Sequence, residues 1–353
     1  MKITNISYER LDLQLSDPYT IAYETVEKTT NFILKAETDL GIVGYGCAAP
    51  DEIVTEENAA DVEHALEDII LPYLKGKEVF MYSRIITELR ELLQHRSSSM
   101  AMADLLLYDL ISKKAGLPLY QFLGGYRKSI ATSVTIGILS LEETLRAAQE
   151  FTDQGFGIIK VKGGLNLEED ISKMLRLREN HPELILRFDG NQGYSVADSI
   201  AFVFATKEVN IEIFEQPTQV SVEGDLGEVT RGVHIPVMAD ESLKTLTDAF
   251  RLAQNKLINM VNIKLMKVGG IHKAMHINSV ARSAKIESMV GCIDECSLGI
   301  SAGLHFALSR PNIKYADLDG HLDMPNDPFK GLFTLKKGIL YPTEEAGLGR
   351  VDF

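Results

Sequence analysis

The 353-residue sequence lacks tryptophan, has only three cysteines and contains no long uninterrupted apolar stretch. Three thiols, an odd number, suit a reducing, cytoplasmic compartment rather than a disulfide framework. Without a long apolar stretch, neither a signal peptide nor a membrane-spanning helix is expected. Lys and Arg total 36 against 50 Asp and Glu, so the clustered positive charge that binds nucleic acid is not expected either. The chain is therefore predicted to act on a small molecule.

Two of the cysteines, Cys292 and Cys296, are close enough in sequence to suggest half of a zinc site. No second pair of Cys or His residues at ligand spacing accompanies them. We therefore expect both to be packing residues, since a free cysteine behaves as a small buried hydrophobe.

The first 125 residues differ in pattern from the rest. Residues 1–48 alternate apolar and polar side chains around a turn signal at Thr38–Gly41, which predicts an antiparallel meander. The polar stretch Ser16–Thr30 is predicted to be a long loop between the first two strands. Helical periodicity follows from Thr55 to Ala115, and Gly124-Gly125 marks a boundary. These patterns predict an α+β domain over residues 1–125.

From residue 130 onward, short β-branched runs alternate with helical patterns, which is typical of parallel βα units. Eight strands with seven intervening helices predict a closed barrel, an α/β fold of the modified TIM-barrel type (β/α)7β, over residues 126–324. An open doubly wound sheet is the alternative, but no Gly-rich phosphate motif follows its first strand. The tail, 325–353, has one more short strand pattern and is predicted to return to the first domain. The predicted barrel strands are 131–136, 158–162, 184–189, 211–214, 237–240, 261–264, 286–291 and 313–318.

Three carboxylates end successive predicted strands: Asp189, Glu215 and Asp240. They lie about one βα unit apart, so adjacent strands would direct them into one mouth of the barrel, where barrel chemistry takes place. Three hard oxygen ligands with open positions suit Mg²⁺. The alternative is that each caps the helix that follows its strand, but capping does not require the same spacing twice.

Three lysines also end predicted strands. Lys160 and Lys162 are two residues apart and therefore share a face, and Lys264 belongs to the strand after Asp240. In a closed ring Lys264 approaches the mouth from the side opposite Lys162. Burial and a nearby cation both depress a lysine pKa and make the amine a usable base. A lone strand-end lysine is more simply a solvated charge, but three around one acidic mouth favour catalysis.

Together these motifs resemble the enolase superfamily, in its muconate-lactonizing-like subgroup, over essentially the whole chain. The resemblance implies an α+β capping domain on a barrel, with Mg²⁺ bound by the three carboxylates. It also implies that Lys162 and Lys264 are the acid/base residues and that Lys160 stabilises the enolate. Asn191 matches the polar position that supports the metal site in such proteins.

A pair of aspartates, Asp317 and Asp319, ends the eighth predicted strand and shares a face. Such a pair can bind a substrate ammonium group, although a turn-forming pair is the alternative. Asp-x-Asp at this place resembles the dipeptide epimerases, in which it holds the free N-terminus of the substrate, and Thr135 matches a substrate-contacting position. The resemblance implies that the α-carbon of the C-terminal residue of an Ala-Xaa dipeptide is inverted by proton transfer between two bases.

The preferred Xaa side chain is predicted from the first-domain loop. Relatives that prefer Ala-Glu typically offer an arginine there, whereas this chain has Glu24, which would repel an acidic substrate. Apolar and aromatic neighbours such as Tyr23 favour a hydrophobic or uncharged Xaa. The alternative is that Glu24 and Asp294 together select a cationic Xaa.

Other functions share part of this pattern. An o-succinylbenzoate synthase or an N-acylamino acid racemase of the same subgroup would use the same lysines and metal ligands, but neither substrate has a free ammonium group for Asp317 and Asp319. A Schiff-base aldolase on an ordinary eightfold barrel would use one lysine as nucleophile. A non-catalytic metal-binding barrel is a further alternative. A homo-oligomer is compatible with the sequence, whereas a nucleic-acid or membrane partner is not expected.

Overall fold

Residues 1–20 and 25–351 are described here in a computed structural model of the chain. It begins with a three-stranded antiparallel sheet of β1 (Ile3–Thr20), β2 (Thr25–Thr38) and β3 (Val43–Ala48). The predicted long loop at Ser16–Thr30 is wrong, because β1 and β2 remain paired as far as Thr20 and Thr25, past an irregularity after Gln14. There the hydrogen bonds between the two strands pair the main-chain N–H and C=O groups, although the side chains are mostly polar. The Ser16 N–H donates to the carbonyl of Asp323, 2.8 Å away, so this hairpin reaches the barrel.

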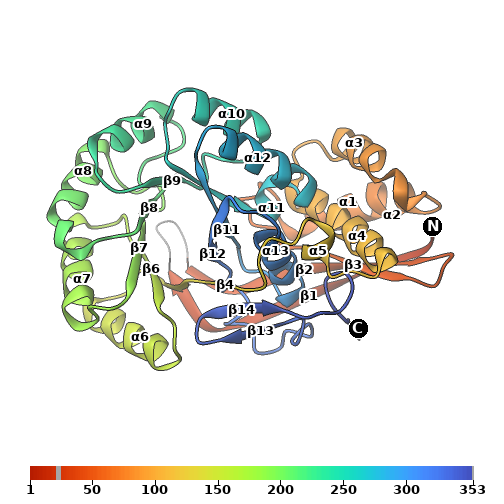
Figure 1. Cartoon of the computed structure of the whole chain (residues 1–353), viewed down its shortest axis with the longest axis horizontal. Helices are drawn as coiled ribbons and strands as arrows, with labels where there is room; N and C mark the ends of the chain where they lie inside the picture. The colour runs from red at the N-terminus through yellow and green to blue at the C-terminus, as the bar shows by residue number, and fades with distance from the viewer. Residues whose placement is uncertain (21–24, 352–353) are drawn as a thin grey trace.

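Helices cover one side of this sheet. We call the sheet and these helices together the cap, which lies at the right of Figure 1. The longest helix, α4, is buried over most of its length and packs directly on β3. Gly46 of β3 permits this, since a Cβ there would lie 2.0 Å from the carbonyl oxygen of Met102. The helices are α1 (Ala59–Ala65), a π-helical turn (Leu66–Ile70), α2 (Leu71–Leu74), a 3-10 turn (Val79–Met81), α3 (Tyr82–Leu93), α4 (Ser97–Ala115) and α5 (Leu119–Phe122).

The predicted barrel is confirmed. Within the described residues, eight parallel strands run in sequence order from β5 to β12, and the ring is nearly closed by a bridge between Thr132 and Ala316. The strands are β5 (Val134–Ile136), β6 (Ile158–Lys162), β7 (Ile185–Asp189), β8 (Ile213–Glu215), β9 (Val237–Ala239), β10 (Met260–Lys264), β11 (Glu287–Gly291) and β12 (Ile313–Asp317).

Each pair of successive barrel strands is connected by a helical crossover on the outside of the ring, as the left half of Figure 1 shows. In chain order these are α6 (Leu141–Asp153), α7 (Leu167–Asn180), α8 (Val196–Ala205) with a 3-10 turn (Lys207–Val209), α9 (Glu223–Gly232), α10 (Leu246–Gln254), α11 (Leu265–Val268) with α12 (Ile271–Ser283), and α13 (Ser297–Ser309).

The tail contains two strands rather than the single one predicted. β13 (Phe333–Lys336) and β14 (Ile339–Pro342) form a hairpin, and β14 also pairs with β4 (Ile130–Ala131). Beyond the hairpin, the Leu348 N–H donates to Asp109 of α4 at 2.8 Å. We keep residues 1–125 and 126–324 as proposed domain bounds, with the tail 325–353 contributing to the first.

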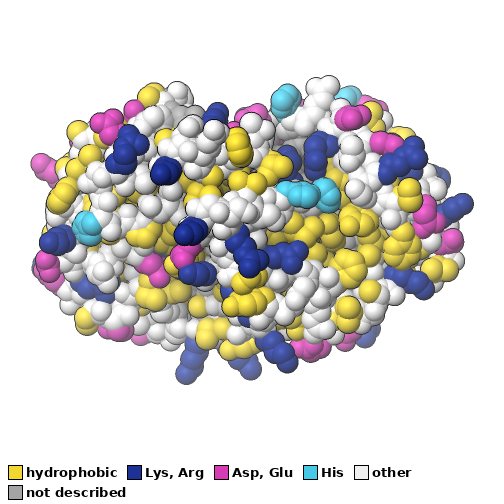
Figure 2. All heavy atoms as spheres, turned by 45° about the horizontal axis from the view of Figure 1, so that its top comes forward, with side chains coloured by type: hydrophobic (Ala, Val, Ile, Leu, Met, Phe, Trp, Pro, Cys, Tyr) yellow, Lys and Arg dark blue, Asp and Glu magenta, His cyan; other side chains and the backbone are white. Residues whose placement is uncertain are grey.

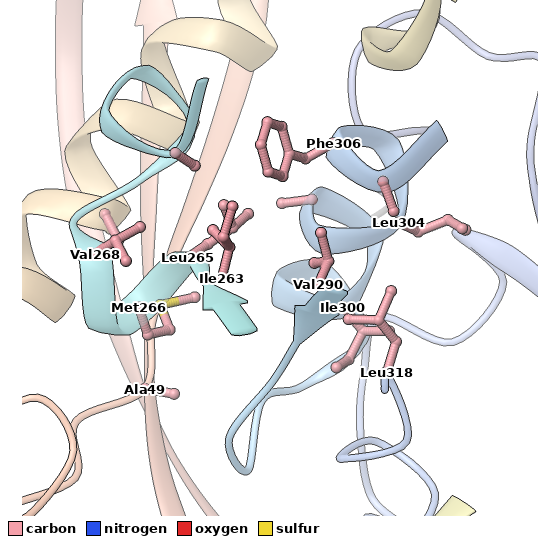
Figure 3. Close-up of a cluster of buried hydrophobic side chains, with 14 of the residues drawn as sticks. Ala49, Ile263, Leu265, Met266, Val268, Val290, Ile300, Leu304, Phe306 and Leu318 are labelled. Atoms are coloured by element: carbon pink, nitrogen blue, oxygen red, sulfur yellow. The ribbon is translucent and has the colours of Figure 1, made fainter. Parts of the chain in front are cut away.

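A hydrophobic cluster between β10, β11 and α13 determines which way β10 turns its side chains. Figure 3 shows Ile263 and Leu265 directed toward Phe306 of α13, and all three are at most 1% exposed. Because side chains alternate along a strand, Asn262 and Lys264 project to the opposite side, into the barrel. The packing of apolar residues therefore positions a charged one.

Figure 2 shows basic and acidic side chains interspersed on one face, with hydrophobic side chains gathered mainly on the right, over the cap. Among the residues described, no helix combines the length and the apolar character that crossing a membrane requires.

Candidate active site

A pocket opens at the C-terminal ends of the barrel strands, beneath the cap. Asp51 and Val54 of the cap contribute to its wall, and the rest comes from barrel strand ends and loops. A second, apolar groove lies between α10 and α12 and is lined by uncharged residues such as Phe250 and Val280, so it offers no acid, base or metal ligand. Seven residues predicted from the sequence line the first pocket: Thr135, Lys160, Lys162, Lys264, Asp294, Asp317 and Asp319.

The three predicted metal ligands lie on neighbouring strands and contact lysines that line this pocket. Asp189 and Glu215 end β7 and β8 and are paired side by side, and Asp240 directly follows β9. All three are at most 2% exposed. None of them caps the following helix, because Ser195 and Thr245 occupy the N-caps of α8 and α10, and α9 begins after Val222. The alternative interpretation as helix caps therefore does not hold.

Lysine ammonium groups lie among these carboxylates. The Lys160 Nζ is 3.6 Å from Asp189 and 3.5 Å from Glu215, and the Lys162 Nζ is 3.6 Å from Asp189. Across the ring, the Lys264 Nζ is 2.8 Å from Asp240. In the described part of the chain, no three His, Cys, Asp or Glu side chains are grouped closely enough to hold one metal ion. Each carboxylate is paired with a lysine instead.

Glu215 nevertheless suits a cation. Its Oε1 accepts a hydrogen bond of 2.6 Å from the Asn262 side chain, while its buried Oε2 accepts none from the described residues. Burial raises the pKa of Glu215 to about 7, which reflects the cost of holding this charge away from water. A buried carboxylate oxygen that accepts no hydrogen bond, with only the Lys160 ammonium group 3.5 Å away and two more carboxylates beside it, is chemically a fit for Mg²⁺.

Neighbouring carboxylates shift the pKa values of two of these lysines. Burial alone would lower the pKa of Lys160, but Asp317, Glu215 and Asp189 raise it well above its ordinary value. Lys264 shows the same balance, with Asp240 as the main opposing carboxylate, so that its pKa is also raised. Each of these ammonium groups is held in its charged form by the carboxylates that it faces at close range.

Two supporting residues were missed by the sequence interpretation. Lys267 is 1% exposed, and its ammonium group contacts both the carboxylate and the main-chain carbonyl of Asp240. Burial would raise the pKa of Asp240, but Lys264 and Lys267 together bring it well below its ordinary value. Asn262, described above, holds Glu215. The signal was present in both cases: a polar residue inside the otherwise apolar run from Met260 to Val268.

Asp317 and Asp319 have different surroundings. Asp317 is 2% exposed, forms an ion pair of 2.5 Å with Lys160 and accepts a hydrogen bond of 2.6 Å from Ser133. Asp319 is only partly buried, and its Oδ2 accepts the Thr135 N–H at 2.7 Å. Burial would raise both pKa values, but Lys160 lowers that of Asp317, whereas Asp317 raises that of Asp319 further. Of the pair, Asp319 is the one more available to a ligand.

The remaining predicted residues have mixed outcomes. The Asn191 N–H donates to Asp189 at 3.0 Å, and its side-chain oxygen is 3.4 Å from the Lys162 Nζ. Tyr23 and Glu24 lie outside the described residues.

The cysteines also have mixed outcomes. Cys296 is buried, as predicted for a packing residue, and its Sγ lies 3.6 Å from that of Cys47. Cys292 is not a simple packing residue, because it lines the pocket together with Ile293 and Asp323.

Two family profiles match the chain. Residues 5–124 match the mandelate racemase / muconate lactonizing enzyme N-terminal domain, and residues 143–351 match the enolase C-terminal domain-like family. The L-Lys-D/L-Arg epimerase of Desulforapulum autotrophicum is 39% identical over 351 residues, which cover 99% of each chain.

Solved structures resemble the whole chain. The substrate-liganded L-Ala-D/L-Glu epimerase from Bacillus subtilis gives a TM-score of 0.97 at 34% identity, over 99% of this chain and 98% of that one. A dipeptide epimerase from Methylococcus capsulatus with Mg and L-Arg-D-Lys gives 0.96 at 37% identity, over 99% and 100%. One from Enterococcus faecalis with Mg and L-Leu-L-Tyr gives 0.96 at 34% identity, over 99% of each chain.

Proposed function

We infer the reaction of this site from one premise: the chain belongs to the mandelate racemase / muconate lactonizing enzyme family of the enolase superfamily. It is an isomerase of the dipeptide epimerase type and uses Mg²⁺. The assignment of residues to roles and the choice of side chain are our proposals. The observation that best supports them is that Lys162 and Lys264 lie on β6 and β10, four strands apart in a ring of eight, on opposite sides of one pocket.

Opposed lysines suit inversion at a carbon. We propose that one of them, as a neutral amine, removes the α-proton of the C-terminal residue. The other, as an ammonium ion, donates a proton to the opposite face. After turnover the protonation states of Lys162 and Lys264 are exchanged, and the reverse reaction uses them in the opposite order. Positioned acid/base groups of this kind typically contribute a factor of about 10²–10⁴ to the rate.

The remaining charged residues stabilise and orient the substrate. Asp189, Glu215 and Asp240 would hold Mg²⁺, which would supply positive charge that stabilises a substrate carboxylate. Lys160 adds a fixed ammonium group where negative charge develops on loss of the α-proton. Asp319 accepts the ammonium group of the N-terminal residue, which fixes the α-carbon between the two bases. Asn191 orients Asp189 through its main-chain N–H.

The pocket wall favours a cationic side chain at Xaa. Besides the Asp317/Asp319 pair, three more aspartates line it, namely Asp51 from the cap and Asp294 and Asp323 from the barrel. Like charges across an interface oppose binding, so a Glu side chain is disfavoured. Val54 and Ile293 offer apolar surface for the methylene groups of Lys or Arg. The hydrophobic or uncharged Xaa predicted from the sequence stays a prediction, to be tested together with the cationic one.

A panel of dipeptides tests this proposal directly. L-Ala-L-Xaa with Xaa as Lys, Arg, Leu, Gln and Glu, together with L-Lys-L-Arg, would be incubated with Mg²⁺ in D2O, and α-deuteration and epimer ratio followed by NMR. We expect the largest kcat/KM for cationic Xaa and the smallest for Glu. Fastest turnover of Ala-Glu would contradict the acidic-wall argument, and absence of turnover for the whole panel would contradict the function.

The two-base assignment has a separate test. We expect Lys162→Ala and Lys264→Ala each to lose epimerisation by roughly a thousandfold. Each variant should still exchange the α-proton of one epimer only, and the two variants should differ in which epimer that is. If both variants exchange both epimers, the lysines are not opposed bases.

The alternative reactions predict other results. For an o-succinylbenzoate synthase or an N-acylamino acid racemase, Asp319→Asn should leave catalysis of their own substrates intact. A Schiff-base aldolase should be trapped by borohydride and be insensitive to EDTA. A cytoplasmic location remains a proposal, supported by three free cysteines, as does a homo-oligomeric state.

A further inference from the structure

We propose that Asn31, a buried residue of the cap strand β2, is a positioning residue for substrate recognition, because its side-chain amide holds the barrel loop that carries Asp294. This inference rests on the dipeptide epimerase function proposed above. Asn31 is 0% exposed and does not line the pocket, whereas Cys292, Ile293 and Asp294 of the loop between β11 and α13 do. Its effect on the substrate is therefore indirect.

The hydrogen bonds of Asn31 bracket the loop. Its Nδ2 donates to the carbonyl oxygen of Asp294 at 3.0 Å, and its Oδ1 accepts the N–H of Cys296 at 2.8 Å. The amide thus pairs with residues two apart, as a neighbouring strand would. The Thr29 hydroxyl donates to the same Asp294 carbonyl at 3.1 Å. Two cap residues therefore fix the peptide group that follows the Asp294 side chain.

Other hydrogen bonds of the loop differ from this link, because those of Cys292 reach Asp319 and Gly320 of the barrel and the following ones do not reach the cap. The Glu295 N–H donates to Ile293 at 2.7 Å, and the Ile293 N–H donates to the Glu295 carboxylate at 3.2 Å. These two bonds lie within the loop, so they set the shape of the turn but not its position relative to the cap. The Ser297 N–H donates to Asp327 at 2.7 Å and fixes only the start of α13. Asn31 and Thr29 link the main chain of Asp294 directly to the cap.

This link matters because the cap and the barrel each contribute part of the pocket wall. Asp51 and Val54 belong to the cap, whereas Ile293 and Asp294 belong to the barrel. The distance between the cap residues and the barrel residues determines which Xaa side chain of the substrate can contact both. The two lysine bases lie on other elements, β6 and β10, so a displaced loop should weaken recognition without altering proton transfer.

Kinetics of Asn31→Ala test the proposal. We expect KM for the preferred dipeptide to rise about tenfold, the effect of losing one well-made hydrogen bond, with kcat within threefold of the wild type. The ratio of kcat/KM between dipeptides with cationic and with uncharged Xaa should become smaller. Thr29→Val removes the Thr29 bond to Asp294 and a 3.3 Å contact with the Asn31 amide but keeps the Asn31 bonds to Asp294 and Cys296, so it should change the same quantities in the same direction but less. The matched control is Asn278→Ala, since Asn278 is 3% exposed and contacts Asn312, away from the pocket.

Amide hydrogen exchange supplies a readout that is independent of activity. We expect residues 292–297 to exchange faster in Asn31→Ala and at the wild-type rate in Asn278→Ala. Unchanged exchange in that segment, or faster exchange with unchanged KM and unchanged preference, would overturn the inference. If the wild type epimerises no dipeptide, the proposed function fails, and the exchange rates still decide whether Asn31 holds the loop.

Discussion

Asp317 and Asp319 are two residues apart and share a sequence motif, but the structure separates their tasks. Asp317 is the close counter-charge of the buried Lys160, with which it forms the ion pair of 2.5 Å. Asp319 contacts the chain mainly through the Thr135 N–H and borders the open pocket. The first is therefore needed to keep Lys160 charged and in place, and the second is suited to bind the substrate.

Substitution by asparagine should distinguish these roles. We expect Asp319→Asn to raise KM by roughly tenfold to a hundredfold, because a charged hydrogen bond to the substrate ammonium group is worth about 1.5–3 kcal/mol. Its stability in urea should be close to that of the wild type. Asp317→Asn should instead lower kcat and destabilise the fold by about 3–5 kcal/mol, since it removes a partner of a buried charge. Equal effects of the two variants on KM and on unfolding would refute this division.

The identities of the site residues could be predicted because each charged residue ends an apolar strand, as Asp189 and Lys264 do. Their partners could not be predicted, because partnership depends on the register between strands and on contacts across the barrel. Ser133 is 184 residues from Asp317 in sequence. Lys267 stands out as a polar residue in a mostly apolar run, but its contact with Asp240 depends on how α11 packs in the fold.

At the scale of elements, two hairpins differ from the sequence prediction, because strand pairing also depends on contacts between distant residues. The hairpin β1–β2 was misread between Ser16 and Thr30 because strand pairing there does not leave an alternating apolar pattern, which is the signal that sequence analysis uses. The tail hairpin β13–β14 was read as one strand because each strand is only four residues long. The barrel strands are predictable, since each is a short, mostly apolar run and helical patterns lie between them.

At the start of α12, a barrel helix is held by hydrogen bonds to the cap helix α4. Asp104, on α4, is 0% exposed and accepts the main-chain N–H groups of Ile271 and His272, the first residues of α12. Gly270 permits this approach, because a Cβ there would lie 2.4 Å from the Asp104 carboxylate and its φ is 96°. Burial raises the pKa of Asp104 to about 7, although these N–H groups oppose the shift.

This raised pKa predicts a dependence of stability on pH. Between its ordinary value of 3.8 and about 7, the folded protein holds a proton on Asp104 that the unfolded chain has released. The stability contributed by this group is therefore complete below pH 3.8 and is lost as the pH rises through 7. Relative to Asp104→Asn, the wild type should lose up to about 4 kcal/mol between pH 4 and 7.5, since each pKa unit is worth about 1.4 kcal/mol.

Urea unfolding at several pH values measures this difference. The exposed Glu9 in β1 provides a control, and Glu9→Gln should follow the wild-type pH dependence throughout. A difference between the wild type and Asp104→Asn that is constant from pH 4 to 7.5 would contradict the assignment to Asp104.

At the scale of the whole molecule, hydrogen bonds and an ion pair between described residues link the cap to the barrel. The Ser16 N–H reaches Asp323, the Asn31 amide reaches Asp294, and the Lys244 ammonium group forms an ion pair of 2.6 Å with Glu56. In Figure 1 the β1–β2 hairpin extends from the cap toward the barrel, consistent with the first two links. The substrate site is thus complete only when the two parts are docked.

The balance of buried charge in the barrel leads to the last prediction. The three proposed metal ligands, Asp189, Glu215 and Asp240, are at most 2% exposed. Because the buried Glu215 Oε2 also accepts no hydrogen bond from the described residues, a divalent cation at these carboxylates should be stabilising. At a hundred times its dissociation constant, Mg²⁺ should add about 2.7 kcal/mol to the free energy of unfolding.

Thermal unfolding with and without MgCl2, at constant ionic strength set with NaCl, measures this gain. For a chain of this size we expect a rise in Tm of several degrees, roughly 2–4 °C per kcal/mol. Asp240→Asn should lose most of the rise, whatever its own Tm, because one of the three ligands is gone, while Glu9→Gln should keep all of it. An equal Mg²⁺-induced rise in Asp240→Asn and the wild type would place the cation elsewhere, and with it the charge on which the proposed proton transfer depends.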